Sequence, residues 1–381
     1  MPFVFFVFTH YASRVRVIVV GAGVIGCTIA YELARAGVRV QVLETRAPGQ
    51  GATRASAGIL APYIEGHEEK LRELGARSLE LYDELIERLR ADSGKDIIYQ
   101  RNGTFEIAFG DADEARLRTQ SVLLGTQNVE FKWLLPATFD DYEPRVAKHA
   151  RGALLIPMHG FVGVTSLTLA AAAAAQKFGA LFKNEIGAIR IYPLPRDRVG
   201  VQTAASMWDA DHVILAAGSW SSQITVQDAE PIPVTPIRGQ LVQLEYTPGD
   251  IRRVLWGPNG YLVPWPDGTV LVGATIEDVG FDESHTESAV QQLRQAAGEL
   301  VPSLVDAPVT GVRTGLRPRG PDELPLLGPS RAVPGLLYAT AHYRNGVLLA
   351  PLTAQLVRGL LLDHAADPAL RDLDPARHGR M

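Results

Sequence analysis

The chain has 381 residues, which at about 150 residues per domain predicts two or three domains. Hydrophobic residues make up 46% and charged residues 21%, so the chain can bury a large core and is not a disordered polymer. The net charge of -5 gives no basic footprint for nucleic acid. The single cysteine, Cys27, excludes an intrachain disulfide framework and a metal site built from several thiolates, and it favours a reducing cytoplasm.

The N-terminus begins with an apolar run, FVFFVF at residues 3–8. It is much shorter than the ~18 residues of a membrane-spanning helix, and no basic segment precedes it. We interpret residues 1–13 as an N-terminal extension, with an atypical signal peptide as the alternative. No association with a membrane is expected.

A strand, a glycine-rich turn, a helix and a second strand follow in about 30 residues, which is typical of a βαβ unit. The apolar run Val15–Val20 predicts a buried parallel strand, and it ends in GAGVIG at 21–26. Apolar residues at four-residue spacing then predict a helix that closes at Gly37. The second strand, Val38–Leu43, ends in Glu44.

This order of elements indicates a dinucleotide site. Gly21 permits the tight turn, Gly23 lets the backbone approach a pyrophosphate, and Gly26 lets the helix pack closely on the strand. The free N–H groups at the start of the helix are expected to face the phosphates. Glu44 is placed to reach an adenosine ribose and to repel a 2′-phosphate. The small-residue segment 51–58 is a second diphosphate contact, a stretch that runs along a flat ring, or a flexible surface loop.

The rest of the chain alternates between helical and strand-like patterns. We expect helices at 71–93, Ser166–Lys177, 287–300 and Val347–Leu362; short strands and loops at 97–109 and 129–156; strands at Leu181–Ile191, Val199–Thr203, Val213–Leu215 and within 235–275; and a loop at 315–328. This alternation predicts an α/β and α+β protein, with a Rossmann-like domain interleaved with a domain built on a mostly antiparallel sheet. The expected divisions are 14–95, 151–226 and 313–365 for the first domain, 96–150 and 227–312 for the second, and 366–381 as a C-terminal tail.

Further motifs follow in a fixed order: GATRASAGILAP at 51–62, AAGSWS at 216–221, PIRGQ at 236–240, YLVP at 261–264, VGATIED at 272–278, GLRP at 315–318 and AHYRNGVLLAP at 341–351. With the glycine-rich turn, they make the chain resemble the amine-oxidising branch of the D-amino-acid oxidase-like flavoproteins, and within it the glycine oxidases of thiamine biosynthesis. The resemblance runs from about Val15 to Leu362.

The resemblance implies non-covalently bound FAD and no metal. The residues that it places at the cofactor are Gly21, Gly23, Val24, Ile25, Gly26, Glu44, Thr45, Ala52, Thr53, Ser56, Ala57, Gly58, Ile59, Ile186, Ala216, Ala217, Gly218, Trp220, His342, Tyr343, Asn345, Gly346, Val347 and Leu348. The last helix begins near Gly346, so its positive end can stabilise negative charge on the reduced flavin. Cys27 is expected to pack in the first helix and not to anchor the flavin, and His342 is expected to pack rather than to act as an acid or base.

The resemblance also implies the substrate site. Arg317 and Tyr261 match the residues that hold a substrate carboxylate, and the carbonyl of Arg344 matches an acceptor for the substrate amine. The implied reaction is oxidative deamination of glycine, sarcosine or small D-amino acids, by hydride transfer from Cα to flavin N5. Oxygen would reoxidise the flavin to give H2O2. The imine would hydrolyse to a 2-oxo acid and ammonia, or pass to thiazole synthesis.

Two alternatives stay open. One is a dehydrogenase of the same fold that passes electrons to a quinone or a protein, and the other is a non-catalytic dinucleotide-binding module. Three positions depart from the family pattern: Ala341 replaces a usual glycine beside the flavin, Trp265 replaces a common arginine, and Ala217 replaces a frequent threonine. The resemblance suggests a homo-oligomer, a tetramer in particular.

Overall fold

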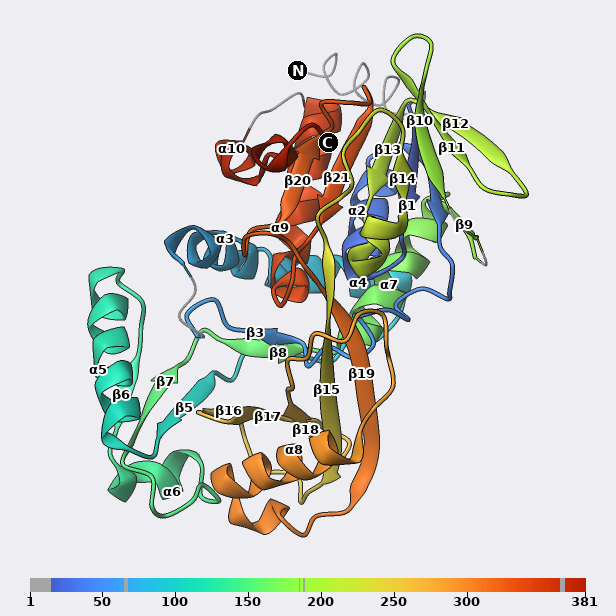
Figure 1. Cartoon of the computed structure of the whole chain (residues 1–381). Helices are drawn as coiled ribbons and strands as arrows, with labels where there is room; N and C mark the ends of the chain where they lie inside the picture. The colour runs from blue at the N-terminus through green and yellow to red at the C-terminus, as the bar shows by residue number, and fades with distance from the viewer. Residues whose placement is uncertain (1–14, 65–67, 185, 188, 364–366) are drawn as a thin grey trace.

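A computed structural model describes residues 15–64, 68–184, 186–187, 189–363 and 367–381. It has two parts, one above the other in Figure 1, each built around a large sheet. The long strands β15 (Thr235–Glu245) and β19 (Val309–Arg319) run from the lower part toward the upper one. Residues 1–13, which we interpret as an N-terminal extension, lie outside the described residues.

The upper part is built on a six-stranded sheet in the order β20-β21-β13-β1-β2-β9. Its strands are β1 (Arg16–Val20), β2 (Arg39–Leu43), β9 (Leu181–Lys183), β13 (His212–Leu215), β20 (Leu326–Pro329) and β21 (Leu336–Thr340). All neighbours are parallel except β20 and β21. Apolar runs form these strands because both faces of the sheet are covered. This is the Rossmann-like arrangement that the sequence predicted.

Helices cover the upper sheet. They are α2 (Val24–Arg35), α3 (Glu69–Glu80), α4 (Tyr82–Ser93), α7 (Val164–Lys177) and α9 (Gly346–Arg358). The helix α2 packs against both α7 and α9, and their apolar faces join in one core. Small residues, above all the buried alanines of α7, let these helices approach closely. A four-stranded sheet packs on the other side, in the order β12-β11-β10-β14: β10 (Arg190–Leu194), β11 (Arg198–Gln202), β12 (Met207–Ala210) and β14 (Thr225–Val226).

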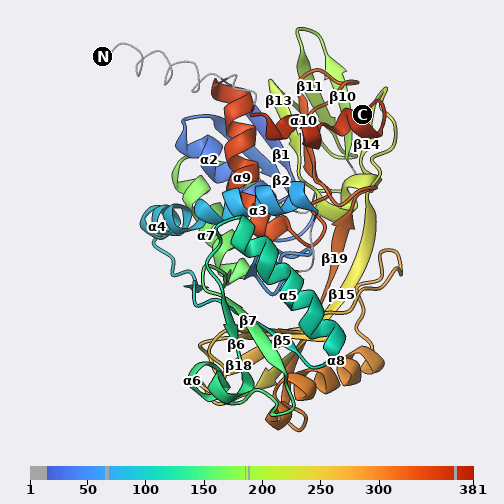
Figure 2. The same cartoon turned by 90° about the vertical axis from the view of Figure 1, so that its left-hand side faces the viewer.

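The lower part holds an eight-stranded sheet in the order β19-β15-β18-β17-β16-β5-β7-β6. Besides β15 and β19 it contains β5 (Thr104–Ala108), β6 (Lys132–Leu134), β7 (Gly152–Ile156), β16 (Val254–Gly257), β17 (Gly260–Pro264) and β18 (Thr269–Gly273). Every pair is antiparallel except β5 with β16. The prediction of a mostly antiparallel second sheet is therefore confirmed. Figure 2 shows α5 (Asp111–Thr126), α6 (Phe139–Tyr142) and α8 (Glu287–Leu300) around it.

A small sheet lies where the two parts meet (Figure 1). Its order is β3-β8-β4, with β3 (Ile59–Leu60), β8 (Gly160–Val162) and β4 (Tyr99–Gln100). Shorter elements complete the fold: the 3-10 turns at Pro136–Thr138, Gly218–Gln223, Pro302–Leu304 and Pro375–His378, a π-helical turn at Gly359–Asp363, and α10 (Ala369–Leu373).

Several expected elements differ from the observed ones. The long helix at 71–93 is two helices that meet at Leu81. The expected loop at 315–328 is wrong at both ends, because β19 continues to Arg319 and pairs with β15 despite its glycine and proline, and β20 begins at Leu326. The helix α5 was not foreseen. Of its 16 residues only Leu117 and Leu124 are buried, so it shows no apolar periodicity.

One segment, Gly346–Asp363, is long and apolar enough to cross a membrane by length and composition. However, 67% of it is buried inside the protein, as expected for a core helix. The division into two interleaved domains stays a proposal. The expected boundary between residues 312 and 313 falls inside β19, and the boundary between residues 150 and 151 falls just before β7.

Candidate active site

A cavity of about 750 Å³ extends from the glycine-rich turn after β1 to β15 and β17 in the lower sheet. This volume lies within the roughly 300–1,000 Å³ of typical ligand and cofactor pockets. All the predicted site residues line the cavity except Gly26 and Ile186. The fold therefore brings into one cavity residues that lie more than 300 positions apart in the sequence.

The turn at 21–26 is packed so closely that no side chain fits at Gly21 or Gly26. A Cβ at Gly21, whose φ is +107°, would overlap the carbonyl oxygen of Ala216. A Cβ at Gly26 would overlap the carbonyl oxygen of Gly21. Gly26 thus lies behind the cavity lining, where it lets α2 approach β1 as predicted.

Side chains also hold the start of α2. The Val24 N–H, expected to be free, donates to the hydroxyl oxygen of Thr53 at 3.0 Å. Because that oxygen accepts here, the hydroxyl proton of Thr53 can be donated elsewhere, and both residues line the cavity. The prediction of free N–H groups is therefore wrong at Val24, because Thr53 from the 51–58 segment reaches the helix end.

Glu44 fixes the end of β2 against the glycine-rich turn. Its Oε2 accepts from the Ala22 N–H at 2.7 Å, and its Oε1 accepts from the N–H groups of Thr45 and Arg46 at 2.8 and 2.9 Å. An ionised carboxylate offers about four acceptor positions, so Oε2 can also accept from a ribose hydroxyl in the cavity. Ile186 lies close by, and its N–H donates to the Glu44 carbonyl at 3.0 Å, while Gly187 lines the cavity.

The segment 216–220 reaches the cavity from the end of β13 and is tied to the lower sheet. The Ser219 hydroxyl donates to the Leu316 carbonyl of β19 at 2.8 Å. Trp220 lies under the guanidinium of Arg46, with 4.7 Å between guanidinium carbon and ring centroid. This segment therefore connects the upper sheet to the strand that carries Arg317.

The segment 341–348 leads into α9 along the cavity wall. Ala341 and Tyr343 both have left-handed backbone angles, with φ of +60° and +46°, which are unusual for residues with side chains. His342 between them is 3% exposed, and burial lowers its pKa from 6.5 to about 3. Its Nε2 hydrogen-bonds to the Thr353 hydroxyl at 3.0 Å. His342 is thus neutral near pH 7, consistent with a packing role.

Arg317 lies at the lower end of the cavity, on β19. Its Nη1 donates to the Thr275 carbonyl at 2.9 Å and to the Arg238 carbonyl at 3.4 Å. Its guanidinium covers Gly239 so closely that a Cβ there would overlap it. No carboxylate of the described residues forms an ion pair with Arg317. An anion entering the cavity therefore meets a charged planar donor.

Tyr261, on β17, lines the same cavity and is also closely packed. A Cβ at Gly273 would overlap its hydroxyl, and the Trp256 ring lies 4.8 Å from its ring, centroid to centroid. Both aromatic rings line the cavity. Arg344 also lines it, with its guanidinium 5.4 Å from the Tyr343 ring centroid. The three predicted substrate residues therefore line one cavity, although they come from three separate segments.

Comparison with known proteins agrees with this geometry. Residues 16–360 match the family model described as "DAO: FAD dependent oxidoreductase". The chain belongs to this family of FAD-dependent oxidoreductases. It is 33% identical to a glycine oxidase of Pseudomonas aeruginosa, over 91% of this chain and 94% of that protein.

A second relative and a solved structure are also similar to this flavoprotein over most of its length. It is 36% identical to the bifunctional protein ThiO/ThiG of Nostoc over 93% of its own length, but it spans only 54% of that protein. The crystal structure of glycine oxidase from Geobacillus kaustophilus superposes with a TM-score of 0.89 at 30% identity, covering 96% of this chain and 100% of that one.

The residues present fit FAD. Gly23 lines the cavity, where the absence of a side chain leaves the backbone open to a diphosphate, and the Thr53 hydroxyl and the N-terminus of α9 face the same cavity. Cys27 fits a packing role: its thiol is fully buried, donates to the Ala22 carbonyl at 3.3 Å, and lies outside the cavity lining. Burial raises the pKa of this thiol, so it stays protonated.

Sequence reasoning missed part of the lining. Arg46, Gly239 and Trp256 all line the cavity of the flavoprotein. The PIRGQ motif pointed to Gly239, but only the pairing of β15 with β19 places it under Arg317. Trp265, which departs from the family pattern, lies outside the lining. It is 9% exposed and packs against Phe161, with 5.9 Å between ring centroids.

Proposed function

We propose that this flavoprotein oxidises small amino acids of the glycine type, with glycine, sarcosine and small D-amino acids as the substrate class. The observation that carries the proposal is the Arg317 guanidinium, which faces the cavity without a carboxylate partner among the described residues. A substrate carboxylate would supply that partner, and the Tyr261 hydroxyl would add a neutral donor. The named activity of the relatives from Pseudomonas and Geobacillus supports the same substrate class.

In this proposal the protein works by orientation. Arg317 and Tyr261 hold the carboxylate, and the Arg344 carbonyl accepts from the neutral substrate amine, so that Cα faces the cofactor. Bound FAD would accept a hydride from Cα and pass the electrons to O2, giving H2O2, while the imine hydrolyses to a 2-oxo acid and ammonia. His342 takes no proton in this scheme, because its pKa of about 3 keeps it neutral.

The proposal also includes the fate of the imine, the location of the enzyme and its electron acceptor. The relative named bifunctional protein ThiO/ThiG has a second part beside the part that matches this chain. That fusion supports transfer of the imine from this enzyme to thiazole synthesis in a thiamine pathway. We further infer a cytoplasmic homo-oligomer with non-covalently held FAD. A dehydrogenase that uses a quinone or a protein as electron acceptor is the second candidate, and it is distinguished by rapid dye reduction without aerobic H2O2.

The deciding experiment compares R317A with R319A. Arg319 lies two residues further along β19, where it pairs with Asp278 at 3.3 Å, and it lies outside the cavity lining. We expect R317A to lower kcat/KM for glycine or sarcosine by about 100-fold or more, because a charged bidentate contact is lost. R319A should stay close to the wild type. The proposal is wrong if R317A oxidises these amino acids as efficiently as R319A.

A further inference from the structure

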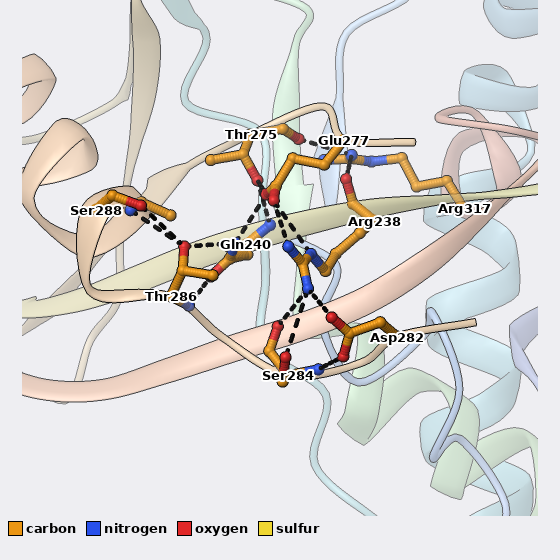
Figure 3. A network of polar contacts seen from close by, with 10 residues as sticks. Arg238, Gln240, Thr275, Glu277, Asp282, Ser284, Thr286, Ser288 and Arg317 are labelled. Carbon is orange, nitrogen blue, oxygen red and sulfur yellow. Dashed lines mark hydrogen bonds and ion pairs between the residues drawn. The ribbon is translucent and has the colours of Figure 1, made fainter. Parts of the chain in front are cut away.

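Behind Arg317, on the opposite face of the lower sheet, lies a polar network (Figure 3). Successive residues of β15 point to opposite faces, so Gly239 faces the cavity while Arg238 and Gln240 face the other way. Arg238 is 4% exposed and Gln240 is fully buried. Both belong to the PIRGQ motif, for which the proposed reaction gives no role.

Glu277 is the centre of this network. Its Oε2 accepts from the Nε and Nη2 of Arg238 at 3.2 and 2.6 Å. Its Oε1 accepts from the Gln240 side chain at 2.7 Å and from the Thr275 hydroxyl at 2.5 Å. Burial opposes the charge, but these hydrogen bonds outweigh it, so the pKa of Glu277 is lowered from 4.5. All four acceptor positions of the carboxylate are therefore used.

The same two residues of β15 hold the segment that follows Glu277. Arg238 Nη1 donates to the Asp282 carboxylate at 2.6 Å and to the Ser284 carbonyl at 3.1 Å. The Gln240 side chain accepts from the Thr286 N–H at 2.8 Å, just before α8 begins. Figure 3 shows these contacts converging on Arg238 and Gln240. The segment 275–286 is thus fixed at both ends and in the middle.

Thr275 connects this network to the cavity. Its hydroxyl accepts from the Gln240 N–H at 2.9 Å and donates to Glu277, so the residue is held on two sides. Its carbonyl accepts from Arg317 Nη1 at 2.9 Å. The second carbonyl that Arg317 contacts belongs to Arg238 itself. The Thr275 carbonyl is therefore held by the network, whereas the Arg238 carbonyl belongs to the backbone of β15, which pairs with β19.

We propose that Arg238, Gln240 and Glu277 are positioning residues: they fix the Thr275 carbonyl, and through it hold the Arg317 guanidinium flat on Gly239, ready for a substrate carboxylate. This inference rests on the proposed function, because it assigns a supporting set to the same carboxylate site. It predicts that breaking the network weakens carboxylate binding before it affects the cofactor or the fold.

The first test is the isosteric variant E277Q. Its amide would turn an N–H2 group toward donors that now point at a carboxylate, while the size of the side chain is kept. We expect KM for glycine or sarcosine to rise by about tenfold, with kcat changed by less than about threefold. The dissociation constant for acetate, followed by the flavin absorbance of the holoenzyme, should rise by the same factor as KM.

E143Q is the matched control. Glu143 is a buried carboxylate in the lower part of the protein and is also held by an arginine, Arg253 at 3.0 Å, but neither residue lines the cavity. A loss that reflected only weaker packing would raise KM in both variants equally. That result would contradict a positioning role for Glu277.

Two further variants guard against a folding defect. R238K keeps the charge, but a lysine ammonium lacks the planar set of N–H donors with which the Arg238 guanidinium contacts both Glu277 and Asp282. We therefore expect its KM to lie between those of the wild type and R238A. In an R317A background, E277Q should change KM by less than about twofold, because its effect passes through Arg317. Equal effects of E277Q in both backgrounds would overturn the proposal.

A crystal structure of the E277Q holoenzyme separates this inference from the proposed function. We expect the Arg317 guanidinium to have moved off Gly239 and away from the Thr275 carbonyl. If the wild type oxidises no amino acid, the proposed function fails, but a displaced guanidinium still supports the network as a positioning device. A guanidinium that stays in place overturns the inference even if the wild type oxidises glycine.

Discussion

The two ends of the cavity are built in different ways. At the cofactor end, the turn at 21–26 is one continuous stretch whose backbone packs on itself and on Ala216. At the proposed substrate end, Tyr261 and Arg317 come from separate strands, and they pack against glycines and carbonyls of other segments. The first end is a local device of the backbone, whereas the second is an assembly of side chains.

This difference predicts how each end fails. A change in the turn forces the main chain apart, so it costs stability and cofactor together. A change near Arg317 displaces only the far end of a flexible side chain, so it costs substrate affinity and leaves the fold intact. The following variants test that distinction, beginning with the one of largest expected effect.

G26A is expected to be the most damaging. The added Cβ would overlap the Gly21 carbonyl oxygen, and only a shift of α2 away from β1 relieves the clash. We expect a loss of at least about 2 kcal/mol of unfolding free energy and loss of bound flavin, measured by denaturant unfolding and by flavin absorbance. The control is G125A in α5, whose Cβ would meet only Phe131 at 3.9 Å. A G26A protein that retains flavin would show that the turn is not a cofactor cradle.

G239A should separate the two ends. Its Cβ would overlap the Arg317 guanidinium, which can swing aside, so we expect KM for glycine or sarcosine to rise about tenfold or more. Flavin content and Tm should stay near those of the wild type. G311A is the control on β19, because its Cβ would make only an ordinary contact with Gln243 at 3.8 Å. Equal KM values for the two variants would contradict the role assigned to Gly239.

E143Q tests how the stability of the lower part of the protein depends on pH. Burial outweighs the hydrogen bonds from Arg252 and Arg253 and raises the pKa of Glu143 from 4.5 to about 7. The folded protein therefore binds an extra proton between these pH values, and its stability falls as pH rises through them.

We expect the stability of the wild type relative to E143Q to decrease by on the order of 2 kcal/mol from pH 4.5 to 8, measured by denaturant unfolding. His342 titrates with the opposite sign, because its pKa is lowered to about 3 and stability is lost as pH falls below 6.5. A stability difference that is independent of pH would mean that Glu143 is ionised throughout.

A341G should have the smallest effect. Relief of the left-handed strain at Ala341 is worth about 1 kcal/mol, which slightly exceeds the roughly 0.8 kcal/mol lost with a buried methyl group. A153G is the control, because Ala153 is equally buried but lies in β7 without a positive φ. We expect A341G to be about 1 kcal/mol more stable than A153G by denaturant unfolding. Equal losses would show that Ala341 is not strained.

The sequence by itself determined the glycine-rich turn after β1, the α/β architecture and the second, mostly antiparallel sheet. It could do so because the glycine-rich turn, the helix and Glu44 interact within one short stretch, and because apolar periodicity reflects which faces are buried. It could not show that Thr53 holds the Val24 N–H, since that contact joins two separate segments.

Only the tertiary structure decided how the substrate end is built. The pairing of β15 with β19 puts Gly239 under Arg317, and the return of the chain through Thr275 supplies the carbonyl that orients it. The helix α5 was hidden for a similar reason: it lies at the surface and buries only two apolar side chains, so its sequence carries no periodic signal. Contacts between distant segments depend on register and packing, and a single sequence records neither.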